Sequence, residues 1–306
     1  MTEFPALSDV FRLTRLAPPA DSVSMVLDTD TYNEVDDQFA VAYALLSPAK
    51  LDVQALYAAP FFNARSMSPA DGMEKSYEEI LRLLERLKGF QGAVCRGSTS
   101  YLSDPERPVE SAAAHDLVKR AMRRAESDAP LYVVAIGAIT NIASAILLEP
   151  DIVKRVVVVW LGGHAFHWPH TREFNLWQDV QAARVIFDCG VPLVQIPVMG
   201  VCSHLHTTIP EIEQYVAGRG AIGDYLAEIV KGYHKDHFAW SKVIWDIATI
   251  AYLLDETWTP THLVHSPIVT DQGTWSFDQG RHLIRSAFHV HRDPIFRDLF
   301  TKLASR

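Results

Sequence analysis

Short apolar segments alternate with amphipathic segments along most of the chain, and this alternation limits the possible fold more than any other feature. Val156–Trp160 contains four consecutive valines and is typical of a strand that is buried on both faces of a sheet. In Asp71–Leu87, apolar residues recur at helical spacing and charged residues take the opposite face. Strands that alternate with helices predict an α/β fold with a mostly parallel central sheet, helices on both faces and a Rossmann-like core.

The same patterns predict the other elements and a single domain. Further strands are expected at Val23–Leu27, Asp52–Ala58, Leu131–Ile136 and Pro192–Pro197. Further helices are expected at Asp36–Leu46, Ser111–Glu126, Asn141–Leu148, Asp179–Asp188, 222–237 and 244–254. The last predicted elements are a hairpin of Thr274–Phe277 with His282–His291 and a closing helix from Pro294. Because no linker interrupts the series, we expect one domain over residues 1–306 with a core of roughly 23–300.

Composition narrows the class of protein. Of 306 residues, 37 are Asp or Glu and 28 are Lys or Arg, which gives a formal charge of −9. A protein that binds the phosphate backbone of nucleic acid needs a basic surface, so this charge argues against such binding. No apolar run approaches the roughly 20 residues of a membrane helix, and the first residues lack a secretory-signal pattern. Cys95, Cys189 and Cys202 are widely spaced, which favours buried thiols in a reducing compartment. The sequence predicts a soluble cytoplasmic protein without nucleic-acid or membrane partners.

An acidic cluster directly follows the first predicted strand. Residues 28–37 contain five carboxylates: Asp28, Asp30, Glu34, Asp36 and Asp37. In a parallel sheet this position is the carboxyl edge, where α/β folds place their ligands. Two of these residues begin a predicted helix, so capping and the helix dipole account for one or two of the charges. Five converging carboxylates favour a site for a hard cation such as Ca²⁺ or Mg²⁺.

Asp246 is an isolated acidic residue in an otherwise apolar segment late in the chain. A carboxylate in such surroundings is unfavourable unless a partner neutralises it. Two interpretations are open: Asp246 caps a helix, or it is a distant ligand that completes the acidic site. We favour the second interpretation because it explains why an acid occupies this position.

A loop with two glycines follows the valine-rich strand and carries several polar side chains. Glycines let a loop approach a ligand closely, and the groups of Glu173 and Asn175 are suited to sugar hydroxyls. The histidines of this loop are His164, His167 and His170. Their spacing suggests a zinc site, but a Trp-Pro pair interrupts any helical face. Ordinary loop histidines, or one histidine that acts as a proton donor, are therefore the favoured interpretation.

Four motifs, in this order, resemble the inosine/uridine-preferring nucleoside hydrolase family. The family opens with an apolar strand and DxDxxxDD, continues with a turn like Gly-x-Leu-Thr-Asn, a Trp-Met-Gly-Gly-like strand end and Glu-Phe-Asn, and closes with His-Asp before an apolar helix. The corresponding segments here are Asp28-Thr-Asp30 with Asp36-Asp37, Val133–Asn141, Trp160–Gly163 with Glu173-Phe-Asn175, and Trp245-Asp246. The similarity spans roughly residues 23–300.

The resemblance implies a Ca²⁺-dependent hydrolase that cleaves the N-glycosidic bond of ribonucleosides or related N-ribosides, in purine or pyrimidine salvage. It implies a homodimer or homotetramer. The implied cation ligands are Asp30, Asp37, the main-chain carbonyl of Ile136, and Asp246, and the implied ribose ligands are Asp36, Glu173 and Asn175. Asp30 would also act as general base on the cation-bound water. Clustered negative charge favours the oxocarbenium-like transition state of glycoside cleavage.

The sequence departs from the family pattern in three places. The acidic loop is longer by two residues, and the family's sugar-binding Asn after the second strand is missing unless Asn63 substitutes for it. Trp245 stands where the family has His, so Trp245 either stacks on the base or packs at the start of a helix. The group that donates a proton to the leaving base is therefore unassigned; the candidates are His167, Tyr233 and His237.

Two other functions are open. Asp28-Thr-Asp30 after a buried strand also fits a phosphatase of the haloacid dehalogenase type, although Tyr32 stands where that type has Thr. A non-catalytic, metal-dependent protein that binds ribose or nucleosides would keep the carboxylates and lack the histidine before the last Asp. Release of a base from a nucleoside distinguishes the hydrolase from both alternatives.

Overall fold

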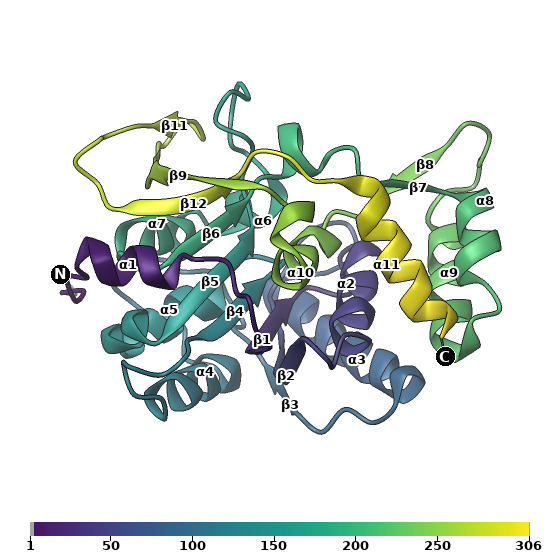
Figure 1. Cartoon of the computed structure of the whole chain (residues 1–306), viewed down its shortest axis with the longest axis horizontal. Coiled ribbons are helices and arrows are strands. Elements are labelled where there is room, and N and C mark those ends of the chain that lie inside the picture. The colour runs from purple at the N-terminus through teal and green to yellow at the C-terminus, as the bar shows by residue number, and fades with distance from the viewer. Residues whose placement is uncertain (1–2, 306) are drawn as a thin grey trace.

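The structure is a computed structural model that describes residues 3–305, so the ends of the predicted 1–306 domain lie outside it. An eight-stranded sheet runs through the molecule in the order β3-β2-β1-β4-β5-β6-β12-β9, and within it only β9 is antiparallel to its neighbour (Figure 1). Its strands are β1 (Val23–Thr29), β2 (Leu51–Ala58), β3 (Ala93–Arg96), β4 (Leu131–Ala135), β5 (Val156–Leu161), β6 (Leu193–Ile196), β9 (Thr261–His265) and β12 (Leu283–Ala287). The α/β fold with a mostly parallel sheet is confirmed.

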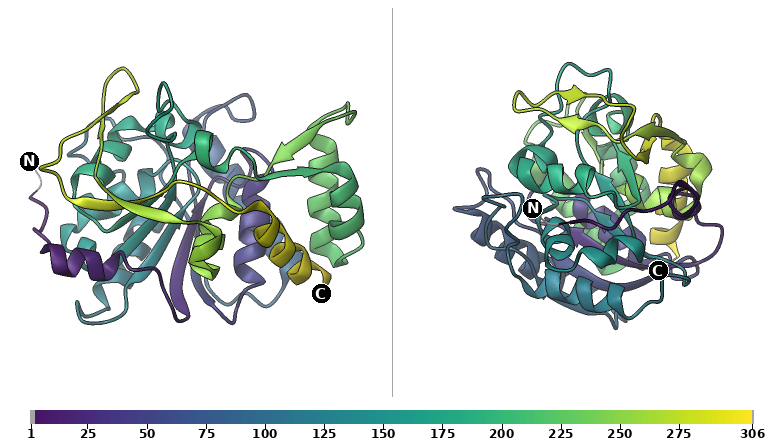
Figure 2. Two further views of the ribbon diagram at one scale, coloured as in Figure 1. Left: turned by 45° about the horizontal axis from the view of Figure 1, so that its top comes forward. Right: turned by 90° about the vertical axis from the view of Figure 1, so that its left-hand side faces the viewer.

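Helices cover both faces of this sheet (Figure 2). One face packs against α2 (Asp36–Leu45), α3 (Pro69–Leu87) and α10 (Ile247–Leu254). Outside these helices, α9 (Gly220–Tyr233) packs against α2 and α3, and α11 (Arg292–Ala304) packs against α10. The other face packs against α4 (Ala112–Met122), α5 (Thr140–Leu148) and α7 (Val180–Asp188). Successive strand residues point to opposite faces, so Met25 and Leu27 join the first apolar cluster and Val26 joins the second.

The remaining elements are short and lie around this core. They are α1 (Asp9–Arg15), α6 (Phe174–Gln178), α8 (Ile209–Glu211), and two small pairs of strands, β7 (His206–Thr208) with β8 (Ser241–Val243) and β10 (Ile268–Val269) with β11 (Trp275–Ser276). In residues 3–305 no helix is both long enough and apolar enough to cross a bilayer. Of the three cysteines, Cys189 and Cys202 are buried, Cys95 is half-buried, and none forms a disulfide.

The predicted C-terminal hairpin is wrong. β11 pairs with β10, and β12 pairs with β9 on one side and β6 on the other. The prediction paired β12 with the nearest apolar segment. Its true partner β9 has three half-buried and two exposed residues, and its sequence shows no clear apolar alternation. β3 was missed for the same reason, since its four residues are only partly buried. A strand at the edge of a sheet needs little apolar surface, so pattern alone does not reveal it.

The strand order places a topological switch point between β1 and β4. From β1 the chain continues to β2 and β3 on one side, and from β4 it continues to β5 and β6 on the other. In open α/β sheets, ligands bind outside the carboxyl ends of the strands at such a point, because the connecting loops diverge there. Asp30 follows β1 and Ile136 follows β4, so both predicted ligands lie at the switch point.

A buried amide holds the loops at this edge together. The side chain of Asn141 donates to Asp28 Oδ1 at 2.7 Å and to the Ala58 carbonyl at 3.2 Å. Its oxygen accepts hydrogen bonds from the main-chain N–H of Ser98 at 2.7 Å and from the Ser98 hydroxyl at 2.8 Å. Asn141 therefore joins the ends of β1 and β2 to the loop after β3. The segment Val133–Asn141 thus does more than connect a strand to a helix, because its last residue holds three other segments in place.

We expect Asn141→Ala to lower the free energy of unfolding by roughly 2–5 kcal/mol, because it leaves several buried polar groups without partners. Urea unfolding followed by circular dichroism measures this change. Gln91→Ala removes an exposed amide that bonds only to nearby main-chain carbonyls and should change stability by less than about 0.5 kcal/mol. Equal effects of the two substitutions would contradict the bracing role of Asn141.

Candidate active site

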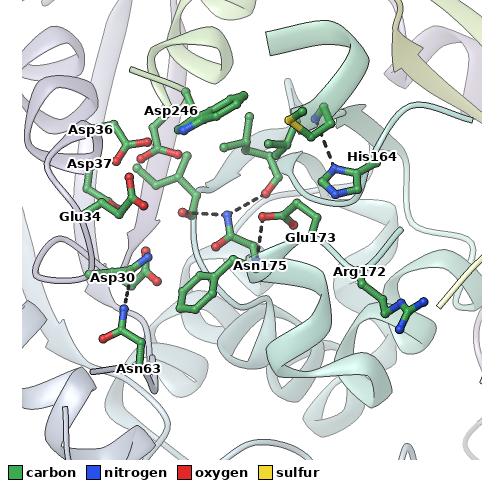
Figure 3. Close-up of a pocket in the computed structure, with 17 residues that line it drawn as sticks. Asp30, Glu34, Asp36, Asp37, Asn63, His164, Arg172, Glu173, Asn175 and Asp246 are labelled. Carbon is green, nitrogen blue, oxygen red and sulfur yellow. Dashed lines mark hydrogen bonds between the residues drawn. The ribbon is translucent and has the colours of Figure 1, made fainter. Parts of the chain in front are cut away.

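A pocket of about 470 Å³ opens at the carboxyl edge of the sheet, where the loops after β1, β4 and β5 meet the starts of α2, α6 and α10. Figure 3 shows its two walls. Carboxylates form one wall, with Asp36, Asp37 and Asp246 side by side. Glu173, Asn175 and His164 come from the opposite side. The pocket is large enough for a ligand of nucleoside size, whose sugar and base differ in polarity.

The carboxylates of the acidic wall come from elements that are far apart in the sequence. Asp36 and Asp37 occupy the first turn of α2, and Asp246 immediately precedes α10. One oxygen of each of the three lies within 4.8 Å of the others, which is close enough for a single cation to contact all three. The Asp246 carboxylate makes no capping hydrogen bond to α10, so helix capping does not explain this residue.

Asp30 has the least satisfied side chain of the acidic wall. It is 1% exposed, and neither carboxylate oxygen has a hydrogen-bond partner among residues 3–305. The side chain packs against Gly137, where a Cβ atom would lie 3.1 Å from Asp30 Cγ. A buried carboxylate without hydrogen bonds is costly, and a cation is the partner that fits an oxygen-only donor set.

Burial, followed by mutual repulsion, raises the pKa values of the acidic wall. Desolvation is the largest cause for Asp30, Asp37 and Asp246, and each pKa is raised further by neighbouring carboxylates. Burial raises the pKa of Asp36 to about 6, while the nearby Lys242 ammonium lowers it. Lys242 forms an ion pair with Glu34, so it offsets only part of the charge. The wall therefore favours either bound protons or a bound cation.

The opposite wall is held by a dense set of main-chain hydrogen bonds. Glu173 caps α6: its carboxylate accepts from the N–H groups of Asn175 at 2.9 Å, Leu176 at 3.0 Å and Gly163 at 2.9 Å. Burial raises the pKa of Glu173 to about 7, although these N–H groups lower it. The Asn175 amide nitrogen donates to the carbonyls of Ile136 and Leu161, so its orientation is fixed.

The structure brings most of the predicted site residues together. Those that line the pocket are Asp30, Asp36, Asp37, Asn63, Ile136, Glu173, Asn175, Trp245 and Asp246. Asn63 donates to Asn33 Oδ1 at 2.6 Å and so holds the two-residue extension of the acidic loop in place.

His167 and Tyr233 do not line the pocket. His167 lies on the exposed side of its loop beside Gly200, and Tyr233 stacks on Trp240 above Lys242. His237, the third donor candidate, contacts the Lys231 carbonyl and is also absent from the lining. These three candidates were chosen from sequence proximity, whereas the end of α9 and the two loops that carry the histidines place the side chains elsewhere.

Sequence reasoning did not single out His164 and Arg172, which do line the pocket. His164 is 7% exposed and follows Gly163, whose φ of +74° turns the chain at the end of β5. A partial sequence signal was present, because a proton-donating histidine in this loop was one of the two favoured interpretations. Spacing alone could not choose among the three.

Comparisons with known proteins identify the family. Residues 25–289 match the inosine-uridine preferring nucleoside hydrolase family. The pyrimidine-specific ribonucleoside hydrolase RihA of Salmonella typhimurium is 27% identical over 263 residues, which are 76% of this chain and 80% of that protein. RihA of Escherichia coli O1:K1 is 26% identical with the same coverage.

Solved structures share the fold. A plant nucleoside hydrolase superimposes with a TM-score of 0.75 at 21% identity and covers 93% of this chain and 99% of its own. A purine-preferring ribonucleoside hydrolase from Gardnerella vaginalis also gives a TM-score of 0.75, at 20% identity, over 92% of this chain and 98% of its own.

These matches place the protein among the α/β enzymes that hydrolyse the N-glycosidic bond of nucleosides. The chain belongs to the inosine-uridine preferring nucleoside hydrolase family. The prediction of a nucleoside hydrolase is thereby confirmed. The family match supports neither the phosphatase nor the non-catalytic binding protein.

We expect Asp246→Asn to raise the free energy of unfolding of the cation-free protein by roughly 1–3 kcal/mol at about pH 8. The pKa of Asp246 is raised on folding, so its contribution to stability is lost as pH rises from the ordinary value of 3.8 through the folded value. The variant should therefore differ least from the wild type below about pH 4, where the carboxyl is protonated in both the folded and the unfolded state.

Urea unfolding with a chelator at several pH values measures this difference. Asp52→Asn, at the exposed amino end of β2, is the matched control and should show no such pH-dependent gain. A gain for Asp246→Asn that does not change with pH would show that charge repulsion is not its cause.

Proposed function

We propose that this enzyme hydrolyses ribonucleosides or related N-ribosides with the help of a divalent cation, and that Ca²⁺ is the preferred ion. The observation that carries the proposal is the buried Asp30 carboxylate, which has no hydrogen-bond partner among the described residues and faces Asp36 and Asp37. Burial of a carboxylate without a partner lowers the stability of the folded protein, unless a bound cation or a water molecule interacts with it.

Asp30, Asp37, Asp246 and the Ile136 carbonyl would hold the cation. All four groups line the pocket and all offer oxygen, which hard cations prefer. The tightest cluster of oxygens is that of Asp36, Asp37 and Asp246, so Asp36 lies close enough to share the charge of the ion. When bound, the cation offsets the repulsion within the acidic wall and makes water a better nucleophile.

Asp36, Glu173 and Asn175 would hold the ribose hydroxyls. They approach the pocket from both walls, so a sugar between them is held on two sides (Figure 3). Because both donor bonds of the Asn175 amide are used within the protein, its oxygen is the atom left to accept from a hydroxyl. A sugar held in this way presents its anomeric carbon to the carboxylates with little freedom to rotate.

Asp30 would act as the general base. Its unpartnered oxygens can take a proton from an attacking water, and its raised pKa makes it a stronger base than an exposed carboxylate. As the bond from the anomeric carbon to the base breaks, positive charge develops on the sugar. The acidic wall would stabilise that charge through electrostatic attraction.

Trp245 favours a large base. Its indole lines the pocket beside the acidic wall, at the position where the family carries a histidine. Stacking of a purine on an indole buries more surface than stacking of a pyrimidine, so we propose a preference for purines or for a modified base. Salmonella RihA is named as pyrimidine-specific and the Gardnerella enzyme as purine-preferring, so the relatives include both kinds. A homodimer or homotetramer, a role in salvage and a cytoplasmic location stay predictions from the resemblance.

We expect the wild type to release base and reducing sugar from at least one purine ribonucleoside, and to act more weakly on common pyrimidine nucleosides. Asp30→Asn should reduce kcat by about 10²–10⁴-fold, because it removes the general base while it keeps the shape of the side chain. A reducing-sugar assay over a panel of nucleosides measures both effects. Asp52→Asn, at the opposite edge of the sheet, is the control and should retain full activity.

We expect Asp246→Ala to lose bound divalent cation, because it removes one of the three clustered carboxylates. Elemental analysis of the purified variant, together with Ca²⁺ titration calorimetry, measures the loss, and Asp52→Ala should bind as the wild type does. Undiminished cation content in Asp246→Ala would show that the ion, if bound, lies elsewhere.

A further inference from the structure

The pocket is rich in hydrogen-bond acceptors and poor in donors. Its side chains with N–H groups are His164, Arg172, Trp245, Asn33, Asn63 and Asn175. Both N–H groups of the Asn175 amide and one of the Asn63 amide are used within the protein. Asn33 and Asn63 are bonded to each other, and the Asn33 main-chain N–H bonds to the Asp30 carbonyl, so both amides lie with the acidic loop that would hold the sugar. Sugar hydroxyls can donate to the many carboxylates. The departing base, which gains negative charge, instead needs one of the few remaining donors.

Two of these donors are poorly placed for that task. The Arg172 side chain is exposed, lies over the Trp177 ring at 5.9 Å and is directed away from the carboxylates (Figure 3). Trp245, if it stacks on the base, keeps its indole N–H in the plane of the ring and so directs it past the face of the base. His164 is the donor that remains.

The hydrogen bonds of His164 decide which ring nitrogen carries the proton. Nδ1 accepts from the Met199 main-chain N–H at 3.2 Å, so the neutral ring carries its proton on Nε2. Within the part of the chain that the structure describes, no hydrogen bond occupies Nε2, and the His164 side chain lines the pocket. The ring is held between Trp168 and His170, with centroids 6.1 and 5.4 Å away, so its donor has a fixed direction.

We propose that the Nε2–H of His164 donates a hydrogen bond to the departing base. His164 would thereby take the role of the histidine that the family has at the position of Trp245. This proposal rests on the proposed function and names a catalytic residue for it. The bond from the anomeric carbon to the base breaks with both electrons going to the base, and the oxygen of water bonds to that carbon. Asp30 takes one proton from the water, and the released base takes a proton from solvent.

A neutral donor suits this environment. Burial, and then the neighbouring His170, lower the pKa of His164 to about 4, so the ring stays uncharged at neutral pH and keeps its proton on Nε2. A neutral imidazole can stabilise developing negative charge through a hydrogen bond without giving up its proton. His164 also brings no positive charge to a site where the sugar itself becomes cationic.

The test compares two leaving groups in two variants. His164→Phe keeps the ring volume and removes the donor, and His164→Gln keeps an N–H group. The substrates are the preferred purine nucleoside and p-nitrophenyl β-D-ribofuranoside, whose leaving group is stable as an anion without a hydrogen bond. His167→Phe is the matched control, because His167 lies in the same loop outside the pocket lining. Thermal unfolding checks that each variant is folded.

We expect His164→Phe to lower kcat on the nucleoside by about 10²-fold with little change in KM, and to lower kcat on the p-nitrophenyl riboside by less than about fivefold. His164→Gln should recover part of the nucleoside activity. Equal losses on the two substrates, no loss on either, or the same loss in His167→Phe would overturn the assignment. A wild type that cleaves neither substrate would overturn the proposed function, and this inference with it.

Discussion

Mutual repulsion among buried carboxylates is the constraint on which the rest of this structure depends. Asp30, Asp37 and Asp246 are almost fully covered, and burial, followed by the charge of neighbouring carboxylates, raises the pKa of each. The fold holds them by fixing each to a different rigid element: the end of β1, the first turn of α2 and the start of α10. We propose that this concentration of negative charge, which is unfavourable by itself, serves to hold a cation and to stabilise positive charge on the sugar.

Neutral and paired groups around the acidic wall make this arrangement tolerable. Asn141 joins the ends of β1 and β2 to the loop after β3, and the Lys242–Glu34 pair limits the charge beside Asp36. The opposite wall has its polar groups satisfied by main-chain hydrogen bonds, as at Glu173. The two walls therefore differ in how their carboxylates are held: main-chain N–H groups bond to Glu173, whereas the Asp30 carboxylate has no such partner among the described residues.

Sequence reasoning succeeded where the signal was local. The valine-rich strand is buried on both faces as β5, and the helix that follows the acidic cluster begins at Asp36 as predicted. Asp246 was assigned to the acidic site because an acid in an apolar segment needs a partner, and the structure places it beside Asp36. The reasoning failed at β9, where a half-exposed edge strand pairs with a distant partner and leaves little trace in the pattern.

By itself the sequence determined the fold class, the acidic site and the family, because apolar periodicity and clustered charge are properties of short segments. Only the tertiary structure decided which histidine lines the pocket. His164 and His167 are three residues apart in one loop, yet the turn at Gly163 and the bond from Met199 place the first against the pocket and leave the second outside. Such a choice depends on contacts between loops that only the order of the strands brings together.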